Sequence, residues 1–439
     1  MKRFWCVLSA VVLLFNFTLP AGAASQVPTL HCEAALVIAP DTGYVLFSKN
    51  DFVRRSPSSL VKIMTALVAI ENIPDLSVEI TVSATAVSNL SGLATSSLKE
   101  GEVMTALNLL YCLLLNSGAD AANALAEHTA GSVTAFVDLM NKRALQLGMT
   151  DTQFINPHGK DDNAQYTTAF DLAKLAVAAL KNQQLSDIVK VQYKRIPRTN
   201  KTTSDRYYFS NNALIISSAE RRSVEDYYYR YATGLMTGYS TEANYNIMAS
   251  ATRDGLFLIT IVLGATRDEA TRDKHHYTDA VDLMMWVYEN FKMAKLMNKL
   301  EPVGEAPVTL SSTTDVVTLV SPEEFTSIIP SDTDPSELTR TVTAAGPLEA
   351  PVAKGEIVGE VAFSYGDHTY GTGVLVSQSE VDRSFLLFAL SRITNFVFGP
   401  WVYNTVAILL IGFMSYAVFT IRFNKRRSRR KYKKAQRGG

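Results

Sequence analysis

A serine and a lysine separated by two residues, Ser59 and Lys62, have a spacing that suits nucleophilic catalysis. Residues three apart on a helix have neighbouring side chains. A serine hydroxyl is a weak nucleophile until a nearby base removes its proton. A lysine amine can be that base where burial or nearby positive charge lowers its pKa. The pair is therefore a candidate for covalent chemistry at the Ser59 hydroxyl.

The same spacing occurs again at Ser96 and Lys99, so the motif has to be judged by its context. Pro57 marks a helix start just before Ser59, whereas no helix start precedes Ser96 and Gly101 soon follows it. The N-terminus of a helix also favours negative charge on a reacting oxygen. We therefore expect Ser59 to be the nucleophile. A Ser-x-x-Lys motif without such context is ordinarily a solvated helix face.

Hydrophobic periodicity predicts the elements that position this pair. Apolar residues at positions 60, 63, 64, 67 and 68 share one side of a helix, beside which Ser59 and Lys62 lie. Asp120 is a suitable N-cap for a later helix. Strands are expected within residues 35–47 and 245–263, and further helices at 106–115, 120–126, 132–147, 168–180 and 279–291. This order predicts an α/β (α+β) domain with helices packed on an antiparallel sheet.

The composition changes after about residue 300, where short Val- and Thr-rich runs alternate with Pro, Gly and Ser. No helical period appears there, so we expect a small all-β domain over residues 299–380, following a first domain over 24–298. Residues 381–400 have an imperfect amphipathic pattern that suits either an interfacial helix or a plain connector.

Both ends of the chain carry apolar segments. Residues 1–23 combine a basic start, an apolar run and a small-x-small site, which predicts a cleaved signal peptide; a transmembrane helix is the alternative. Residues 401–421 hold no charged residue and are long enough to span a bilayer. The basic tail at 422–439 should remain cytoplasmic under the positive-inside rule, so we expect a single-pass protein with its bulk outside.

The charge balance depends on these segments. The whole chain has 42 basic and 42 acidic residues, but the signal and the tail contain 2 and 10 of the basic ones and no acidic ones. The part between them therefore has 30 basic and 42 acidic residues, a net charge of −12. This surface is unsuited to nucleic acid, and the tail is better explained by topology and lipid contact.

The cysteines and histidines indicate neither a metal nor an organic cofactor. Cys6 leaves with the signal peptide, and Cys32 and Cys112 could either pair in an oxidising compartment or remain free and buried. No Cys/His cluster has metal-ligand spacing, and the adjacent pair His275 and His276 cannot alone make a site.

The residues around Ser59, from Arg55 to Thr65, resemble the serine D-Ala-D-Ala carboxypeptidases, which are the low-molecular-weight penicillin-binding proteins of peptidase family S11. The resemblance is collinear over about residues 30–380. Its other matching stretches are Asp41–Gly43, Leu115–Ala122, Leu147–Thr150, Phe154–Gly159, Thr168–Ala173 and Ala350–Gly359.

The resemblance implies a fold and a mechanism. It implies a penicillin-binding, β-lactamase-like domain, a β-rich C-terminal domain and a place in the bacterial cell envelope. Ser59 would attack a D-Ala-D-Ala-terminated peptidoglycan stem peptide, with Lys62 as general base and Ser117 as proton shuttle. The N–H groups of Ser59 and Tyr239 would form the oxyanion hole. β-Lactams would acylate the same serine. No cofactor is implied, and the oligomeric state stays open.

Two motifs depart from the family pattern. The second motif, Ser-x-Asn in the family, ends here in Ala119. The third, Lys-Thr-Gly, reads Met236, Thr237, Gly238, although Thr237 could still bind the substrate carboxylate. Two alternatives therefore stay open: a catalytically impaired relative that binds peptidoglycan or scaffolds wall enzymes, and a β-lactamase. The retained Ser59, Lys62 and Ser117 favour an active carboxypeptidase, and the membrane anchor and β domain speak against a β-lactamase.

Overall fold

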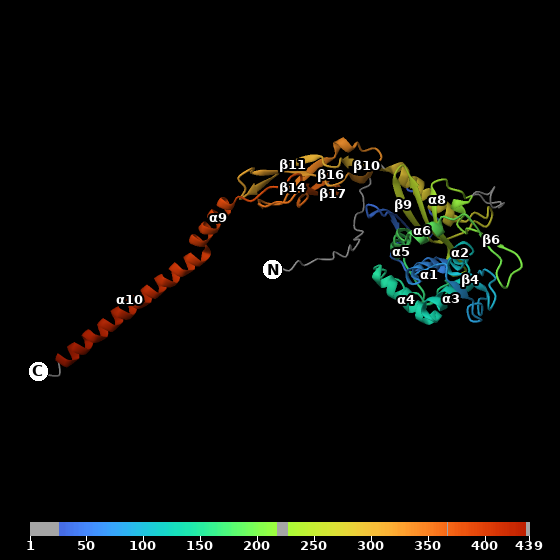
Figure 1. Ribbon diagram of the computed structural model, residues 1–439, viewed down its shortest axis with the longest axis horizontal. Helices are drawn as coiled ribbons and strands as arrows, with labels where there is room; N and C mark the ends of the chain where they lie inside the picture. The colour runs from blue at the N-terminus through green and yellow to red at the C-terminus, as the bar shows by residue number, and fades with distance from the viewer. Residues whose placement is uncertain (1–25, 217–226, 367, 436–439) are drawn as a thin grey trace. The chain divides into compact units, whose positions relative to one another are not determined.

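The structure, a computed structural model, describes residues 26–216, 227–366 and 368–435 (Figure 1). The predicted signal peptide at 1–23 lies outside the described residues. The chain divides into two compact units. The first runs to Ala294 and includes Ser327–Glu337; the second comprises Lys295–Thr326 and the chain from Leu338 onward. Each unit is described by itself.

A five-stranded antiparallel sheet forms the centre of the first unit. Its strand order is β2-β1-β9-β8-β7, so β7 is an edge strand. β1 and β2 form a hairpin before Ser59, and β8 and β9 form another, both where strands were predicted. The bounds are β1 Ala34–Ala39, β2 Tyr44–Lys49, β7 Ala232–Ser240, β8 Asn244–Arg253 and β9 Leu256–Ala265.

Alternation along the strands sends side chains into two separate cores. On β1, Leu36 and Ile38 pack in the larger cluster with the helical layer, whereas Ala35 and Val37 pack in a second cluster with α8. The predicted arrangement of helices on an antiparallel sheet is therefore confirmed. The helices are α1 Val61–Asn72, α2 Ala106–Leu115, α3 Ala119–Ala130, α4 Val133–Gln146, α5 Ala169–Lys181, α6 Gln183–Val189 and α8 His275–Asn290.

Three local predictions require correction or completion. The N-cap of α3 is Gly118, and Asp120 lies inside its first turn. The Asp120 carboxylate instead accepts hydrogen bonds from the backbone N–H groups of Ser96 and Leu98, at 2.9 and 3.0 Å.

The last helix of the unit begins at His275, four residues before the predicted start. Cys32 and Cys112 are both free and buried, and they belong to the two different cores, so they do not pair.

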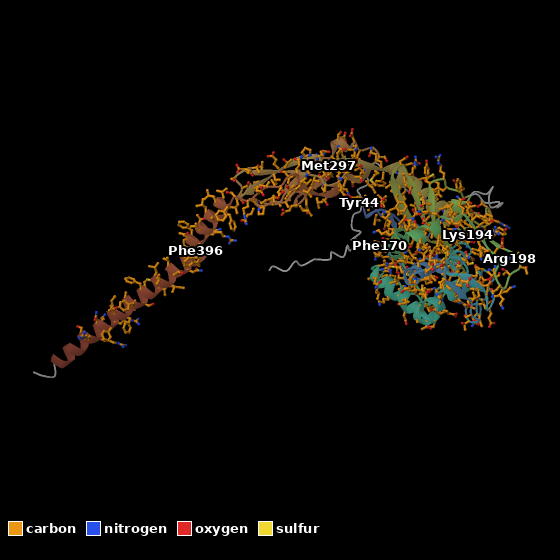
Figure 2. All side chains as sticks on the ribbon, viewed as in Figure 1. Tyr44, Phe170, Lys194, Arg198, Met297 and Phe396 are labelled. Atoms are coloured by element: carbon orange, nitrogen blue, oxygen red, sulfur yellow. The ribbon has the colours of Figure 1, made fainter. Side chains whose placement is uncertain are left out.

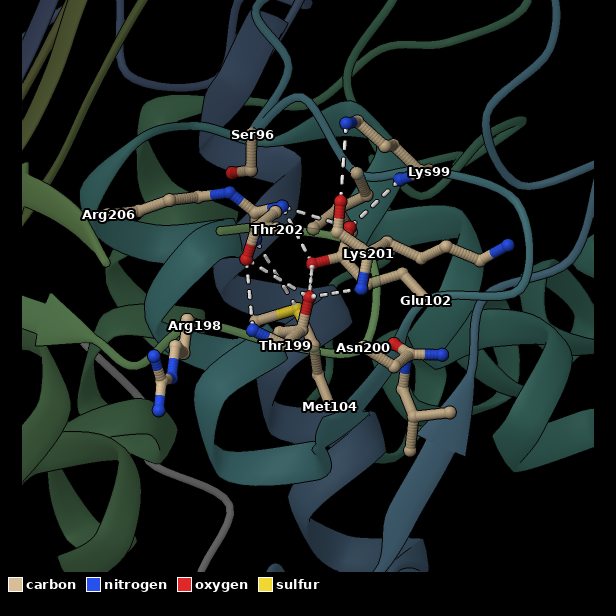
Figure 3. A network of polar contacts seen from close by, with 12 residues as sticks. Ser96, Lys99, Glu102, Met104, Arg198, Thr199, Asn200, Lys201, Thr202 and Arg206 are labelled. Atoms are coloured by element: carbon tan, nitrogen blue, oxygen red, sulfur yellow. Dashed lines mark hydrogen bonds and ion pairs between the residues drawn. The ribbon is translucent and has the colours of Figure 1, made fainter. Parts of the chain in front are cut away.

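The second Ser-x-x-Lys copy belongs to a structural network (Figure 3). Glu102, fully buried, accepts from Arg206 Nη2 through both carboxylate oxygens, at 2.6 and 2.9 Å. The same carboxylate accepts from Lys99 N at 3.0 Å and from Thr199 Oγ1 at 2.7 Å. Removing one partner of a buried ion pair typically costs about 3–5 kcal/mol. This network therefore fastens the loop containing Ser96 to a two-stranded hairpin that the sequence did not predict.

That hairpin pairs β5 with β6, and another two-stranded sheet pairs β3 with β4. The remaining bounds in the first unit are β3 Glu79–Thr81, β4 Val103–Thr105, β5 Tyr193–Ile196, β6 Arg206–Phe209 and the 3₁₀ turns Ser58–Leu60, Ala213–Ile215 and Pro335–Glu337.

The second unit has the predicted all-β domain. Its six-stranded sheet has the order β14-β16-β17-β12-β11-β15, antiparallel except for the β11–β15 pair. Val317, Leu319 and Leu375 are buried in it. Its strands are β11 Pro302–Thr309, β12 Val316–Val320, β14 Thr339–Ala344, β15 Leu348–Glu349, β16 Ile357–Tyr365 and β17 His368–Ser377. A separate two-stranded sheet pairs β10 Phe291–Met297 with β13 Phe325–Pro330, and most residues of both strands belong to the first unit.

Two helices follow this sheet: α9 Phe385–Val397 and α10 Pro400–Ala435. The described residues contain one helical segment, Phe385–Ser428, that is long and apolar enough to be a candidate membrane span. The predicted span at 401–421 lies within it. Many of its apolar side chains are exposed, as Phe396 is (Figure 2). A helix with that much exposed apolar surface needs lipid or a partner to cover it.

Candidate active site

Ser59 lies in a tight turn that presents its side chain at the surface of a buried helix. The 3₁₀ turn Ser58–Leu60 runs directly into α1. Ser58 is fully buried with a positive φ of 45°, and Leu60 is also buried, whereas Ser59 between them is partly exposed. We call residues 56–59 the nucleophile turn. Its shape gives a substrate access to one hydroxyl and keeps the neighbouring side chains inside.

Two of the side chains that the sequence predicted to be catalytic, Lys62 and Ser117, each lie within hydrogen-bonding distance of the third, Ser59. Lys62 Nζ donates to Ser59 Oγ at 2.9 Å. Ser117 Oγ, from the turn between α2 and α3, donates to Ser59 Oγ at 3.1 Å. Lys62 Nζ also donates to the backbone oxygen of His158. The Ser59 hydroxyl therefore has a candidate base and a second hydroxyl beside it.

Burial determines the protonation of this cluster. The Lys62 side chain is 2% exposed, and this burial lowers its pKa to about 7, against the opposing effect of Asp120. The pKa of His158 falls to about 4 because it is buried and because Lys62 and Lys160 are nearby cations. Near neutral pH a substantial fraction of Lys62 is therefore an uncharged amine, which is the form that can accept the Ser59 proton.

Strand β7 borders the nucleophile turn with the four predicted substrate-binding residues. Met236 and Gly238 face the helical core, and Met236 is 2% exposed. A Cβ on Gly238 would lie 2.4 Å from Ser58 Oγ and 3.0 Å from Ser59 N, so only glycine lets the strand come so close. Thr237 and Tyr239 occupy the opposite side of the pleat, and Tyr239 is 57% exposed.

The Thr237 hydroxyl, the candidate ligand for a substrate carboxylate, is already engaged. Its Oγ1 donates to the backbone oxygen of Asn211 at 3.3 Å. The Tyr277 hydroxyl donates to the same oxygen at 2.9 Å. This backbone oxygen therefore keeps one hydrogen bond when Thr237 turns its proton toward a ligand, which lowers the cost of that rotation.

Sequence reasoning assigned no role to the groups that support the nucleophile turn from outside α1. Gly159 has a φ of 85°, and a Cβ there would lie 2.0 Å from Ser58 O. Asn246, fully buried on β8, donates to Ser56 O and Ser58 Oγ. Asp161 accepts from the Ser56 hydroxyl. The available signals were a glycine in a matched stretch and an asparagine within a predicted strand.

Ser96 has none of the surroundings of Ser59. It is 2% exposed, and its Oγ donates to the backbone oxygen of Cys112 at 3.2 Å. Lys99 Nζ, its motif partner, donates instead to the backbone oxygen of Lys201 at 3.3 Å. In the second copy of the motif, the serine hydroxyl and the lysine amine are therefore engaged by different backbone oxygens and not by each other.

Two family models match the chain in succession. One, described as D-alanyl-D-alanine carboxypeptidase, matches residues 21–267. The other, described as Penicillin-binding protein 5, C-terminal domain, matches residues 291–383.

Curated relatives and solved structures agree with these matches. D-alanyl-D-alanine carboxypeptidase DacF of Bacillus subtilis is 24% identical, over 91% of this chain and 99% of that protein. D-alanyl-D-alanine carboxypeptidase DacD of Escherichia coli is 28% identical, over 86% of this chain and 96% of that protein. The structure of penicillin binding protein 5 from Haemophilus influenzae has a TM-score of 0.67 and 24% identity, over 82% of this chain and all of that one. The predicted two-domain fold is confirmed.

The lowered pKa of Lys62 predicts a pH-dependent rate of Ser59 acylation. Below about pH 7 the amine is protonated and cannot act as a base, so the rate should fall about tenfold per pH unit. Above about pH 7 the rate should level off. Stopped-flow measurement with a fluorescent penicillin would give this profile. Lys62→Arg, whose guanidinium stays charged, should be unreactive throughout. A flat wild-type profile would exclude Lys62 as the base.

Proposed function

The chain belongs to the D-alanyl-D-alanine carboxypeptidase family, and on this premise we propose that it removes the terminal D-alanine from peptidoglycan stem peptides through an acyl-enzyme on Ser59. One observation carries the proposal: Ser59 Oγ contacts both Lys62 Nζ and Ser117 Oγ, and burial brings the lysine pKa to about 7. A serine with a partly neutral amine at 2.9 Å can be deprotonated as it attacks.

The proposed reaction uses these groups in order. Lys62 takes the Ser59 proton as Oγ bonds to the carbonyl carbon of the penultimate D-alanine. The N–H groups of Ser59 and Tyr239 stabilise the resulting oxyanion. The C–N bond then breaks, and the departing amine of the terminal D-alanine receives a proton from Lys62 through Ser117. Water, deprotonated by the same lysine, then hydrolyses the ester and regenerates the Ser59 hydroxyl.

The two motif departures leave this chemistry in place. Ala119 and Met236 replace groups that would contact the substrate or the lysine, whereas Lys62 and Ser117 both keep their contacts with Ser59. A hydrogen bond to a charged group contributes about 1.5–3 kcal/mol, so each loss lowers the rate by about one to two powers of ten. We therefore propose a slow but functional carboxypeptidase.

The ends of the chain support a location at the membrane. We propose that residues 25 to about 398 lie outside the cytoplasm, that the candidate span crosses the bilayer, and that the basic tail remains in the cytoplasm. The span has no charged residue over 401–421, and ten basic residues follow it. An enzyme anchored this way acts where D-Ala-D-Ala-terminated peptides are built into the wall.

Penicillin should label Ser59 covalently, because the Ser59 hydroxyl contacts its motif lysine, whereas Ser96 is buried and Lys99 is bonded elsewhere. Intact mass followed by peptide mapping would locate the adduct. Ser59→Ala should abolish labelling, and Ser96→Ala in a folded protein should leave the labelled residue unchanged. An adduct on Ser96, or no adduct at about millimolar penicillin, would mean that the nucleophile is wrongly assigned.

Met236→Lys should raise kcat/KM for a D-Ala-D-Ala-terminated peptide by about tenfold or more. A lysine there would offer the substrate carboxylate a charge-assisted hydrogen bond and would further lower the pKa of Lys62. Met236→Leu is the matched control and should have no such effect.

A second substrate separates the two causes of that gain. The gain from Met236→Lys should be much smaller for a peptide whose terminal carboxylate is amidated. An unchanged rate in a folded Met236→Lys protein would place residue 236 outside the substrate site.

Protease added to intact spheroplasts should remove the ectodomain and leave a fragment containing the span and tail. Immunoblotting with tags placed after residue 30 and at the C-terminus would identify both fragments. Digestion of the C-terminal tag with survival of the other tag would reverse the proposed topology.

A further inference from the structure

We propose that Asn246 and Asp161 are positioning residues that hold the nucleophile turn against β7 and so determine the geometry of the oxyanion hole. The inference rests on the proposed function, because an oxyanion hole matters only if Ser59 is acylated. Neither residue contacts Ser59 itself. Each acts through its neighbours in the nucleophile turn, Ser56 and Ser58.

Asn246 connects the nucleophile turn to the interior of the sheet. Its side chain is fully buried on β8. Its Nδ2 donates to Ser56 O at 3.2 Å and to Ser58 Oγ at 3.1 Å, and its Oδ1 accepts from Gly264 N on β9 at 2.8 Å. Both ends of one amide are thus engaged, and the turn is joined to two central strands. A buried apolar residue there would leave Ser56 O and Gly264 N without these partners.

Asp161 connects the same turn to the end of β7. Its Oδ1 accepts from Ser56 Oγ at 2.8 Å and from Ser240 Oγ at 2.9 Å. Ser240 is the last residue of β7 and directly follows Tyr239, whose N–H is the second proposed oxyanion donor. The carboxylate therefore bridges the two segments that supply the two donors.

The turn needs such support because its backbone is unfavourable and its surroundings are tight. Ser58 adopts a positive φ of 45°, which non-glycine residues rarely take. Gly159 lies close to the Ser58 carbonyl oxygen, and Gly238 lies close to the Ser58 hydroxyl. Without the hydrogen bonds of Asn246 and Asp161, the turn can relax away from β7. The N–H groups of Ser59 and Tyr239 would then separate.

The position of the two donors matters chiefly in the transition state. Oxyanion donors must lie about 2.7–3.1 Å from the oxygen that becomes charged, and losing one such donor typically lowers kcat by about 100- to 1000-fold. Losing an interaction that is made only in the transition state lowers the acylation rate constant and leaves ground-state binding unchanged. Substituting a residue that merely stabilises the fold would change neither the acylation rate constant nor ground-state binding of the molecules that remain folded.

The test measures acylation of the full-length protein, in detergent, by a chromogenic cephalosporin over a range of concentrations. Stopped-flow traces give the limiting acylation rate constant and the dissociation constant separately, and thermal denaturation reports the folded fraction. Asp161→Ala and Asn246→Ala should each lower the limiting rate constant by about tenfold or more, with a dissociation constant within about twofold of wild type.

Two control variants separate positioning from stability. Asp161→Asn should recover most of the wild-type rate, since both serine hydroxyls donate to one oxygen that an amide retains. Ser132→Ala removes the N-cap of α4 and should lower the thermal midpoint with no change in the acylation rate constant. If Asn246→Ala does not fold, the comparison of Asp161→Ala with Asp161→Asn tests the positioning role. Asp161 lies in a partly exposed loop, so its variants should fold.

The outcomes distinguish this inference from the proposed function. An unreactive wild-type protein would overturn the proposed function itself. A reactive wild type whose Asp161→Ala variant acylates at the wild-type limiting rate would overturn the positioning role and leave the function standing. A loss confined to the dissociation constant would also overturn it, because the two residues would then shape substrate binding instead.

Discussion

The proposed chemistry depends on one contact, the 2.9 Å hydrogen bond from the buried Lys62 amine to the Ser59 hydroxyl. A solvated lysine has a pKa near 10.4 and is almost never a base at neutral pH. The packing of the first unit removes water from this amine and lowers its pKa to about 7. Asp120, whose charge opposes this lowering, accepts hydrogen bonds from the backbone N–H groups of Ser96 and Leu98.

The second constraint is the close approach of an edge strand to the nucleophile turn. Gly238 on β7 and Gly159 in the opposing loop both come too near Ser58 for a Cβ. Asn246 and Asp161 supply hydrogen bonds that keep this crowded arrangement together. Three parts of the chain that are distant in sequence thus meet here: the nucleophile turn, the loop after Pro157, and the hairpin formed by β7 and β8.

The substitution of methionine in the third motif is consistent with this packing. Met236 lies in the core cluster of the helical face and is nearly inaccessible, so an apolar side chain stabilises the strand there. Its consequence is electrostatic. Under the proposed function, the site has no cation at this position to attract an anionic substrate or to depress the Lys62 pKa further. Burial alone must then lower that pKa, which makes the packing around α1 part of the catalytic apparatus.

The sequence by itself determined the features that depend on neighbours along the chain. Ser59 and Lys62 are three residues apart on a helix, so their contact is local and readable from spacing. The helix at Ala106–Leu115 and the strand alternation are equally local. Only the tertiary structure decided what depends on distant neighbours. Ser117 reaches Ser59 across 58 positions, Asp120 binds the Ser96 loop instead of capping a helix, and Asn246 joins two strands to the nucleophile turn. The pKa of Lys62 belongs to this second group, because burial is a property of the packed fold and not of any residue alone.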